Sequence, residues 1–331
     1  ANNSPFTGSS IENIASISKT LLGISLLHAQ EAGHLQLDDP VNKYLPFKLT
    51  NPHFPEEIIT IRHLATHTST IKDNEYYGGK AYVLKDVNEA SKDTLDLYVE
   101  LNPPSDFTPM LEYLEKVLKP DGIWYKQEGF LKQKPGELFE YSNVGATLAA
   151  VVLELASGVA YDEYTASHIL TPLNMSATGW SFADIDLNQH TKLYHNANTE
   201  LPLYSLITYP DGGLLTSSND LSLYLSELIR GFSGSGTLLK PSSYKEFFTK
   251  QLTPENFSDD HGENEGLFLS FSAKGLIGHS GGDPGVSTYM FFNPKNGIGS
   301  ILLVNTELDA NGEQQYNTII KILEEFGSRI G

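Results

Sequence analysis

Two side chains near the start of the chain have the types and spacing of a nucleophile and its proton acceptor. Ser16 and Lys19 are three residues apart in the segment SISK, so a helix would place them on one face, about one turn apart. Apolar and small residues surround Lys19, and burial of that kind lowers the pKa of an ammonium. An amine beside a hydroxyl can accept its proton, which predicts covalent catalysis at Ser16.

The Ser-x-x-Lys spacing is weak evidence by itself, because it occurs three times in this chain. Ser69–Lys72 and Ser242–Lys245 have the same spacing, but they lie in polar, turn-rich or surface-helix sequence. Solvated lysines explain those two pairs, and only the first pair starts an apolar helix. The open alternative at this point is that Lys19 is a structural lysine.

Two further segments contain groups that could act together with this pair. In GELFEYSNVGATLAAVVLE, Tyr141 and Asn143 come just before an apolar helix, although an ordinary aromatic residue and a helix N-cap would give the same pattern. In LIGHSGGDPG, His279, Ser280 and Gly281 end a β-type run, and the glycines indicate a close approach of the backbone to another group. A plain glycine-rich bend is the alternative there.

These three segments, in this order and with wide gaps between them, resemble the serine β-lactamase and penicillin-binding protein superfamily. The most similar members are class C β-lactamases, D-alanyl-D-alanine carboxypeptidases and β-lactamase-like carboxylesterases. Further segments are similar too and cover most of the chain, from residue 14 to about residue 305. They are ITIRHLATHTSTI, PGELFEYSN, ILTPLNMSATGW, GGLLTSSNDLSLYL and GHSGGDPGVSTYMFFNP.

The resemblance implies a role for each of the reactive side chains. Ser16 would be the acylated nucleophile, and Lys19 and Tyr141 would share the work of general base and general acid. Which of the two takes the first proton stays open. We expect the phenol of Tyr141 to have a lowered pKa, because it would lie between two ammonium-like groups.

The resemblance also assigns the groups that would hold the substrate. They are Asn143, His279, Ser280 and Gly281. Asn143 would hydrogen-bond a substrate amide, and the backbone N–H groups of Ser16 and Gly282 would form an oxyanion hole. His279 departs from the pattern, since many members have there a lysine that grips a substrate carboxylate. Histidine is near neutral at physiological pH, so we expect weak rather than efficient β-lactamase action.

Composition excludes several other classes of protein. The 331 residues have a formal net charge of −19, which argues against nucleic acid and anionic membrane surfaces as partners. The absence of cysteine excludes disulfides, thiol catalysis and Cys-ligated zinc. His63 and His67 have a spacing that can bind zinc, but no third ligand is evident, so packing is the default reading. We expect no metal, no cofactor and no membrane span.

The elements that must position these residues follow from periodicity and turn signals. Helices are expected at about 16–31, ending at Gly33, and at 110–118, 144–156, 161–169, 219–229, from Pro241, and at 313–328. Asn219 is the expected cap of its helix. β-type runs fill residues 267–305 with a hairpin turn at NPKNG. Residues 72–106 give only loop and weak helix signals.

This order predicts an α+β fold, a β-lactamase-like antiparallel sheet flanked by helices with a mostly helical insertion. Residues 1–50 and 215–331 would form the α/β sandwich domain, and residues 51–214 the helical domain, with the active site between them. Relatives usually have a β-hairpin before the serine helix, and that hairpin is apparently absent from this chain, which has fifteen residues before Ser16.

The predicted function is a serine hydrolase that acts through an acyl-enzyme on the carbonyl of an amide or ester. The substrate would be a small molecule or peptide, and the candidates are a D-Ala-D-Ala carboxypeptidase or other peptidase, a weak β-lactamase and a carboxylesterase. The alternative is a catalytically silent penicillin-binding or cell-wall-sensing module. Family analogy places the protein in the periplasm or outside the cell, and the oligomeric state stays open.

Overall fold

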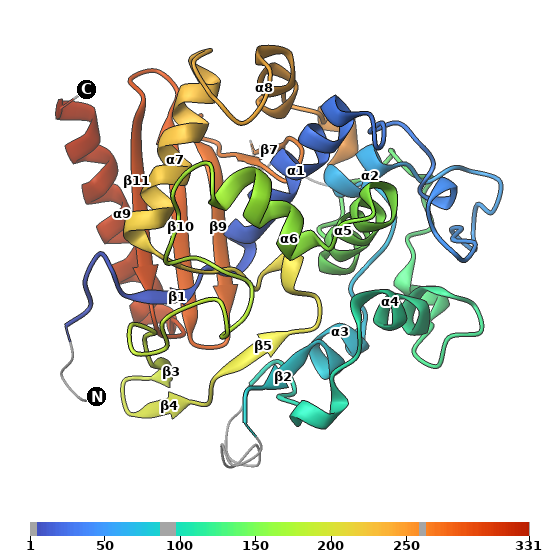
Figure 1. Ribbon diagram of the computed structural model, residues 1–331, viewed down its shortest axis with the longest axis horizontal. Helices are drawn as coiled ribbons and strands as arrows, with labels where there is room; N and C mark the ends of the chain where they lie inside the picture. The colour runs from blue at the N-terminus through green and yellow to red at the C-terminus, as the bar shows by residue number, and fades with distance from the viewer. Residues whose placement is uncertain (1–4, 87–96, 258–262, 331) are drawn as a thin grey trace.

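The computed structural model describes residues 5–86, 97–257 and 263–330. Among these residues the largest sheet is antiparallel, is formed by the C-terminal third of the chain, and lies at one side of the molecule (Figure 1). The strand order in this sheet is β11-β10-β9-β8-β7. The strands are β7 (Asn264–Glu265), β8 (Ser270–Phe271), β9 (Ile277–Asp283), β10 (Val286–Asn293) and β11 (Ile298–Val304). The predicted NPKNG hairpin connects β10 to β11, which pair in antiparallel register.

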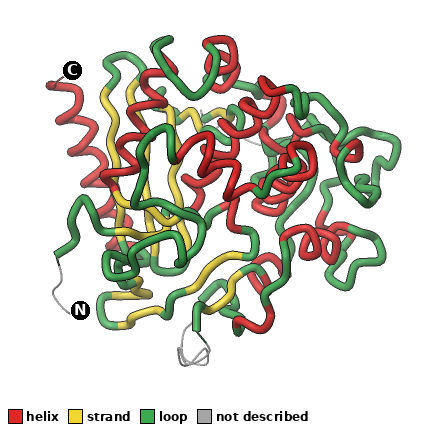
Figure 2. Tube along the Cα trace, in the orientation of Figure 1, coloured by secondary structure: helices red, strands yellow, loops and turns green. Residues whose placement is uncertain are grey.

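Helices cover both faces of this sheet. Successive side chains of β10 point to opposite faces, and apolar residues on each face pack against a helix. Tyr289 and Phe291 pack on one face with Ile320 of α9 (Ala310–Ile330). Phe292 points to the other face, where its ring lies 5.7 Å from that of Phe232 in α7 (Ser218–Phe232). Figure 2 shows the strands enclosed between these helical segments. The sheet is therefore a rigid base for any group placed on β9.

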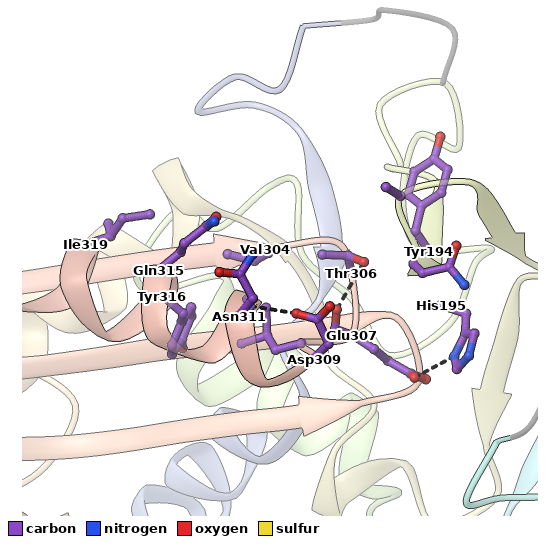
Figure 3. A pocket seen from close by; sticks show the side chains of 14 residues that line it. Tyr194, His195, Val304, Thr306, Glu307, Asp309, Asn311, Gln315, Tyr316 and Ile319 are labelled. Atoms are coloured by element: carbon purple, nitrogen blue, oxygen red, sulfur yellow. Dashed lines mark hydrogen bonds and ion pairs between the residues drawn. The ribbon is translucent and has the colours of Figure 1, made fainter.

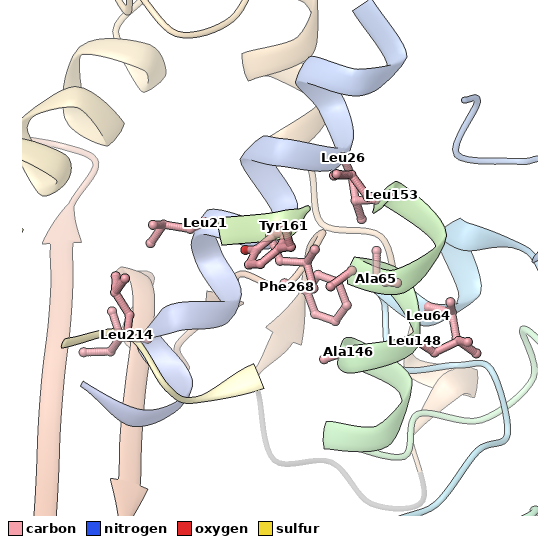
Figure 4. Packing of buried hydrophobic residues seen from close by; sticks show 14 of the residues in the cluster. Leu21, Leu26, Leu64, Ala65, Ala146, Leu148, Leu153, Tyr161, Leu214 and Phe268 are labelled. Atoms are coloured by element: carbon pink, nitrogen blue, oxygen red, sulfur yellow. The ribbon is translucent and has the colours of Figure 1, made fainter. Parts of the chain in front are cut away.

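The helix with the predicted lysine, α1 (Ser18–Ala32), runs through the core. A 3-10 turn, η1 (Ala15–Ile17), precedes it, so the predicted start near Ser16 is confirmed but the first turn is tighter than an α-helix. The predicted end is also confirmed, since Gly33 adopts a left-handed conformation with φ 81°. Leu21 and Leu26 belong to the same buried cluster as Leu153 and Tyr161 (Figure 4).

The middle of the chain supplies most of the remaining helices. They are α2 (Ile61–Ala65), α3 (Glu75–Lys80), α4 (Met110–Leu118), α5 (Asn143–Ser157), α6 (Tyr161–Thr165) with a π-helical continuation (Ala166–Leu170), and, later in the chain, α8 (Pro241–Phe247). Further 3-10 turns are Val41–Lys43, Pro104–Asp106, Gln127–Gly129, η7 (Tyr209–Asp211) and Pro254–Asn256. Both α5 and α8 pack against α1.

Three small antiparallel pairs complete the described structure. They are β1 (Ile11–Asn13) with β6 (Leu215–Ser217), β2 (Tyr82–Leu84) with β5 (Tyr204–Leu206), and β3 (Leu193–Asn196) with β4 (Thr199–Leu201). The pairing of β2 with β5 corrects the expectation of loop and weak helix over residues 72–106. Residues 87–96 of that segment lie outside the described residues.

One local expectation was wrong. The cap of α7 is Ser217, whose side chain accepts the N–H of Asp220, and not Asn219. His279, Ser280 and Gly281 lie toward the end of β9, in agreement with the prediction that they end a β-type run. In the described part of the chain, no single helix is long and apolar enough to cross a membrane, and the one combination that meets that test, α5 with residues 161–170, is bent by 80°.

Candidate active site

Ser16 lies in the tight turn between β1 and α1, and the backbone just before it is strained. Ala15 has φ 47°, a conformation that costs energy for any residue with a side chain. The Asn13 side chain accepts the Ala15 N–H at 2.6 Å, and Thr288 of β10 donates its hydroxyl to the Ile14 carbonyl at 2.9 Å. These contacts hold the serine at the start of the helix.

Lys19 is fully buried and lies one turn further along the same helix face. Its Nζ donates a hydrogen bond to Ser16 Oγ at 3.1 Å, and another to the backbone carbonyl of Asp211 in η7. The apolar residues around Lys19 bury its side chain, and the three-residue spacing places its amine within hydrogen-bonding distance of the Ser16 hydroxyl, as predicted. The second bond comes from a residue far away in the sequence and fixes the direction of the amine.

The pKa of Lys19 differs from the sequence expectation. Burial lowers it, but Tyr141, Asp211 and Asp73 act in the opposite direction and the net pKa is raised. The expectation of a lowered pKa was wrong because it took into account only the burial of the amine, and not Tyr141 and the two carboxyl groups beside it. In the resting state Lys19 is therefore an ammonium.

Tyr141 faces the same amine from the segment before α5. Lys19 Nζ lies 5.0 Å from the centre of its ring. The Tyr141 hydroxyl is buried and makes no hydrogen bond of normal geometry within the described residues, although Ser16 and Lys19 both lower its pKa. Burial outweighs these effects and the pKa of Tyr141 is raised, so the expected lowered value was wrong.

Part of the difference between the expected and the observed pKa of Tyr141 comes from His279, which is neutral in this site. Burial and the nearby Lys19 ammonium lower its pKa to about 4. Its Nδ1 lies 2.5 Å from the Ser280 carbonyl, which can only accept, so the neutral ring has its proton on Nδ1. Its ring centre lies 6.3 Å from that of Tyr141. Tyr141 therefore has one cationic neighbour, Lys19, and not the two that were expected.

His67 packs against Tyr141 and orients it. The two ring centres are 4.4 Å apart, and His67 Nδ1 accepts the backbone N–H of Ser142 at 3.1 Å. Burial lowers the pKa of His67 well below its ordinary value, so the ring is neutral. His63 instead closes the capping box at Thr60. Both histidines thus make contacts that stabilise the local structure. Among the described residues, no group of three potential metal ligands is present.

Asn143 is held by Asp73, a residue to which the sequence analysis gave no role. Asp73 Oδ2 accepts the Asn143 side-chain N–H at 2.8 Å and its backbone N–H at 3.1 Å. Asp73 Oδ1 accepts the N–H of Val144 at 2.9 Å. This carboxylate occupies the positive end of the α5 dipole, and it leaves the Asn143 carbonyl oxygen available to a ligand.

The third motif lies along the edge of β9 that faces the serine. The neighbour β8 pairs with β9 only as far as Gly278, and beyond that point β9 contacts η1. A Cβ at Gly281 would come within 2.6 Å of the Ile14 carbonyl oxygen, so glycine is required for this approach. A Cβ at Gly282 would meet nothing within 4 Å, and Ser280 is exposed.

Asp211 and Asp283 are the other residues that sequence reasoning missed. Asp211 accepts hydrogen bonds from Tyr77 at 2.9 Å and Thr147 at 3.0 Å, and Asp283 accepts one from Tyr82 at 2.7 Å. Burial raises the pKa of Asp211 to about 6 and that of Asp283 to about 7. Each aspartate is next to a glycine that the sequence analysis noted as part of a turn or bend. The sequence around each aspartate, however, has no feature that indicates an inward-pointing side chain.

A cavity of about 470 Å³ lies elsewhere, between the β3–β4 hairpin and the start of α9 (Figure 3). His195 Nδ1 and Glu307 Oε2 are hydrogen-bonded at 2.6 Å at its rim. None of the residues predicted for catalysis lines it. The chemistry described above is therefore confined to the region where η1, α5, η7 and β9 meet.

A sequence profile of a known family, described as Beta-lactamase, matches residues 1–323. Among curated proteins, protein flp of Staphylococcus aureus (strain MW2) is 24% identical over 95% of this chain and 59% of its own length. The chain thus spans less than two thirds of that relative.

Solved structures show the same architecture. The β-lactamase/D-alanine carboxypeptidase of Yersinia pestis, solved with citrate, is 19% identical over 98% of this chain and 86% of its own, with a TM-score of 0.68. The D-amino acid amidase of Ochrobactrum anthropi SV3, solved with D-phenylalanine, is 20% identical over 97% of this chain and 94% of its own, with a TM-score of 0.67. The predicted β-lactamase-like α+β fold is confirmed.

Proposed function

The chain belongs to the beta-lactamase family, and from that premise we propose that it is a serine hydrolase that acts on an amide or ester through an acyl-enzyme at Ser16. One observation supports this most strongly: the buried Lys19 Nζ is 3.1 Å from Ser16 Oγ, beside the phenol of Tyr141. An amine kept from water and aimed at a hydroxyl is the arrangement that activates a serine.

The reaction has two balanced halves. In the first, Ser16 Oγ bonds to the substrate carbonyl carbon, and the amine or alcohol leaves with one proton. In the second, water adds to the same carbon, the acid is released and the Ser16 hydroxyl is restored. Splitting hydrolysis in this way replaces one difficult step with two easier ones.

The Lys19–Tyr141 pair would move the protons. At rest Lys19 is an ammonium and Tyr141 a neutral phenol, because both pKa values are raised. The pair must lose one proton before it can accept the Ser16 proton. It would then return a proton to the leaving group, and the order in which the two side chains act stays open.

The carbonyl oxygen would lie between the backbone N–H groups of Ser16 and Gly282. The strained turn at Ala15 and the β9 edge, unpaired by a strand beyond Gly278, support this assignment. Asn143 and the third-motif residues, His279, Ser280 and Gly281, would contact the rest of the substrate. A family enzyme of this type acts in the periplasm or outside the cell, and we propose the same for this protein.

The test is a panel of acyl donors with wild type and Ser16→Ala. We expect turnover of p-nitrophenyl butyrate or an amide, slow or no turnover of nitrocefin, and an adduct of one acyl group by intact mass. Ser16→Ala should fold with an unchanged thermal midpoint and lose all labelling. Labelling of that variant would identify a different nucleophile, and a stable penicillin adduct without any turnover would favour the silent binding module.

A further inference from the structure

One edge of the large sheet is formed by β11, and among the described residues no strand pairs with it there. β11 is the last strand in the order of the sheet, with β10 as its neighbour. The β3 strand bonds only to the residues that follow β11. The Tyr194 N–H donates to the Asn305 carbonyl at 3.1 Å, and the Tyr194 carbonyl accepts the Glu307 N–H at 2.9 Å. The backbone groups along the rest of this edge are therefore open to another strand.

The direction of these backbone groups follows from the alternation of a β-strand. Both backbone groups of one residue point to the same side, and those of the next residue to the other side. Thr306 faces β10, because its carbonyl accepts the Ser287 hydroxyl of that strand at 3.3 Å. The residues of β11 that face away from β10 are therefore the odd-numbered ones: Gly299, Ile301 and Leu303.

The sequence does nothing to block this edge. Neither a charged side chain nor a proline occurs from residue 296 to residue 306. Charged residues and prolines are the usual means by which proteins keep an exposed edge strand from pairing with another chain. The edge of β11 can therefore pair without burying a charge.

The helix beside this edge has an uncovered apolar face. Ile319, Ile322 and Phe326 of α9 are 44%, 59% and 60% exposed, and their spacing places them on one side of the helix. Ile320 points elsewhere and packs on the sheet. Figure 1 shows α9 and β11 together at one side of the molecule. Large apolar side chains that are exposed as a group mark an interaction site.

The helix and the edge share a midpoint, because α9 runs along β11 in the opposite direction. At one end, an added Cβ at Gly327 would be 2.9 Å from Ile298 Cγ2. At the other end, Tyr316 lines the same cavity as Val304 (Figure 3). The middle of β11 therefore lies near Ile322, the middle of the apolar face. One twofold axis at this point would pair β11 and α9 with their own copies, each antiparallel.

This symmetry also brings opposite charges together. Antiparallel pairing places the β10–β11 turn of one copy near the end of β11 in the other copy. Lys295 in that turn is exposed, and its ammonium makes no ion pair within the described residues. Near the end of β11, the carboxylates of Glu307 and Asp309 line the cavity. Each copy thus carries both halves of a complementary contact, which favours a second copy over an unrelated partner.

We propose that this dimer surface, the open edge of β11 with the apolar face of α9, binds a second copy of the chain and joins the two sheets into one. Strand pairing would satisfy the open N–H and carbonyl groups of both edges, and the paired α9 helices would cover each other's apolar side chains. The inference does not depend on the proposed function at Ser16.

Sedimentation equilibrium of wild type and Ile322→Lys tests the dimer. At about 10 µM we expect wild type to have twice the mass of one chain, and Ile322→Lys to raise the dissociation constant at least about 100-fold. The reason is that Ile322 lies near the axis, where two lysines would face each other. Ile322 is 59% exposed, so the fold should persist, which the thermal midpoint checks. The matched control Ile58→Lys, at a residue 58% exposed in a distant loop, should dimerise like wild type.

Hydrogen exchange tests the edge itself. At the same protein concentration, the N–H groups of Gly299, Ile301 and Leu303 should exchange more slowly in wild type than in Ile322→Lys, because only the dimer bonds them. A monomeric wild type, or a dimer that Ile322→Lys leaves intact, would overturn the inference. Edge amides that exchange equally fast in both proteins would overturn it too, since any dimer would then use another surface.

Discussion

At the scale of single residues, the most informative feature is that burial and charge oppose each other at Lys19. Burial of its amine favours the neutral form, whereas Tyr141, Asp211 and Asp73 together favour the ammonium more strongly. Burial and charge oppose each other at Tyr141 as well. Burial disfavours its phenolate and raises its pKa, whereas the Lys19 ammonium favours the phenolate and lowers the pKa. The two groups therefore form one proton-exchanging unit, and each depends on the other.

Replacement of the amine tests whether this unit is catalytic. Lys19→Met keeps a long apolar side chain in the core, so we expect the fold to persist while kcat/KM for p-nitrophenyl butyrate falls by about 10²–10⁴-fold. The matched control is Lys245→Met, since Lys245 belongs to another Ser-x-x-Lys segment but is exposed on α8. Equal activity of both variants would show that Lys19 is structural.

The raised pKa values also predict how activity depends on pH. The Lys19–Tyr141 pair must lose a proton before it can act as a base, and its resting state retains that proton at neutral pH. We therefore expect kcat/KM for a neutral ester to rise as pH increases through neutrality into the alkaline range. A profile that is already flat from mildly acidic pH would mean that the base is free at rest.

At the scale of elements, the start of α5 is held by a side chain from outside the helix. The sequence indicated the helix and the Ser142–Asn143 start, but the carboxylate of Asp73 that accepts its N–H groups comes from a loop about 70 residues earlier. Burial raises the pKa of Asp73, although the N–H groups of Asn143 and Val144 lower it. The carboxylate positions Asn143 and the preceding Tyr141 segment at the same time.

Asp73→Asn should weaken this anchor. An amide can replace one acceptor oxygen, but its NH₂ group would face N–H donors, so we expect unfolding free energy to fall by about 1–3 kcal/mol. Urea unfolding measures this, with the exposed Asp121→Asn expected to stay within about 0.5 kcal/mol of wild type. Unchanged stability of Asp73→Asn would mean that α5 is held by its core face alone.

The sequence predicted the elements whose signals are local. Gly33 marked the end of α1, NPKNG marked the β10–β11 hairpin, and the residue range 110–118 for α4 agrees with the structure. It missed the pairing of β2 with β5, because three-residue strands from distant segments have no periodicity of their own. Asp73, Asp211 and Asp283 were missed for the same reason, since only the fold turns them toward Lys19.

At the scale of the whole molecule, a chain with a formal net charge of −19 also buries carboxyl groups in its core. Glu12 on β1 is fully buried, and burial raises its pKa to about 8, with one oxygen unpartnered among the described residues. In the unfolded chain the same group ionises near its ordinary value. Between these two pKa values the folded state binds more protons, so stability falls as pH rises.

This predicts a pH dependence of stability with a defined sign. From about pH 7.5, above most of the range where unfolded histidines titrate, to about pH 8, unfolding free energy should decrease with increasing pH, by up to about 1.4 kcal/mol per pH unit for each such group. Glu12→Gln should flatten this slope, whereas Glu56→Gln, at an exposed loop residue, should not. A slope that Glu12→Gln leaves unchanged would assign the effect to other groups.

The most direct measurement of the central claim is the rate at which a single acyl group appears on Ser16, followed by intact mass and peptide mapping in wild type, Lys19→Met and Lys245→Met. We predict one adduct on Ser16, formed at the same rate in wild type and Lys245→Met and at least about 100-fold more slowly in Lys19→Met. An adduct on another residue, or equal rates in all three proteins, would contradict it.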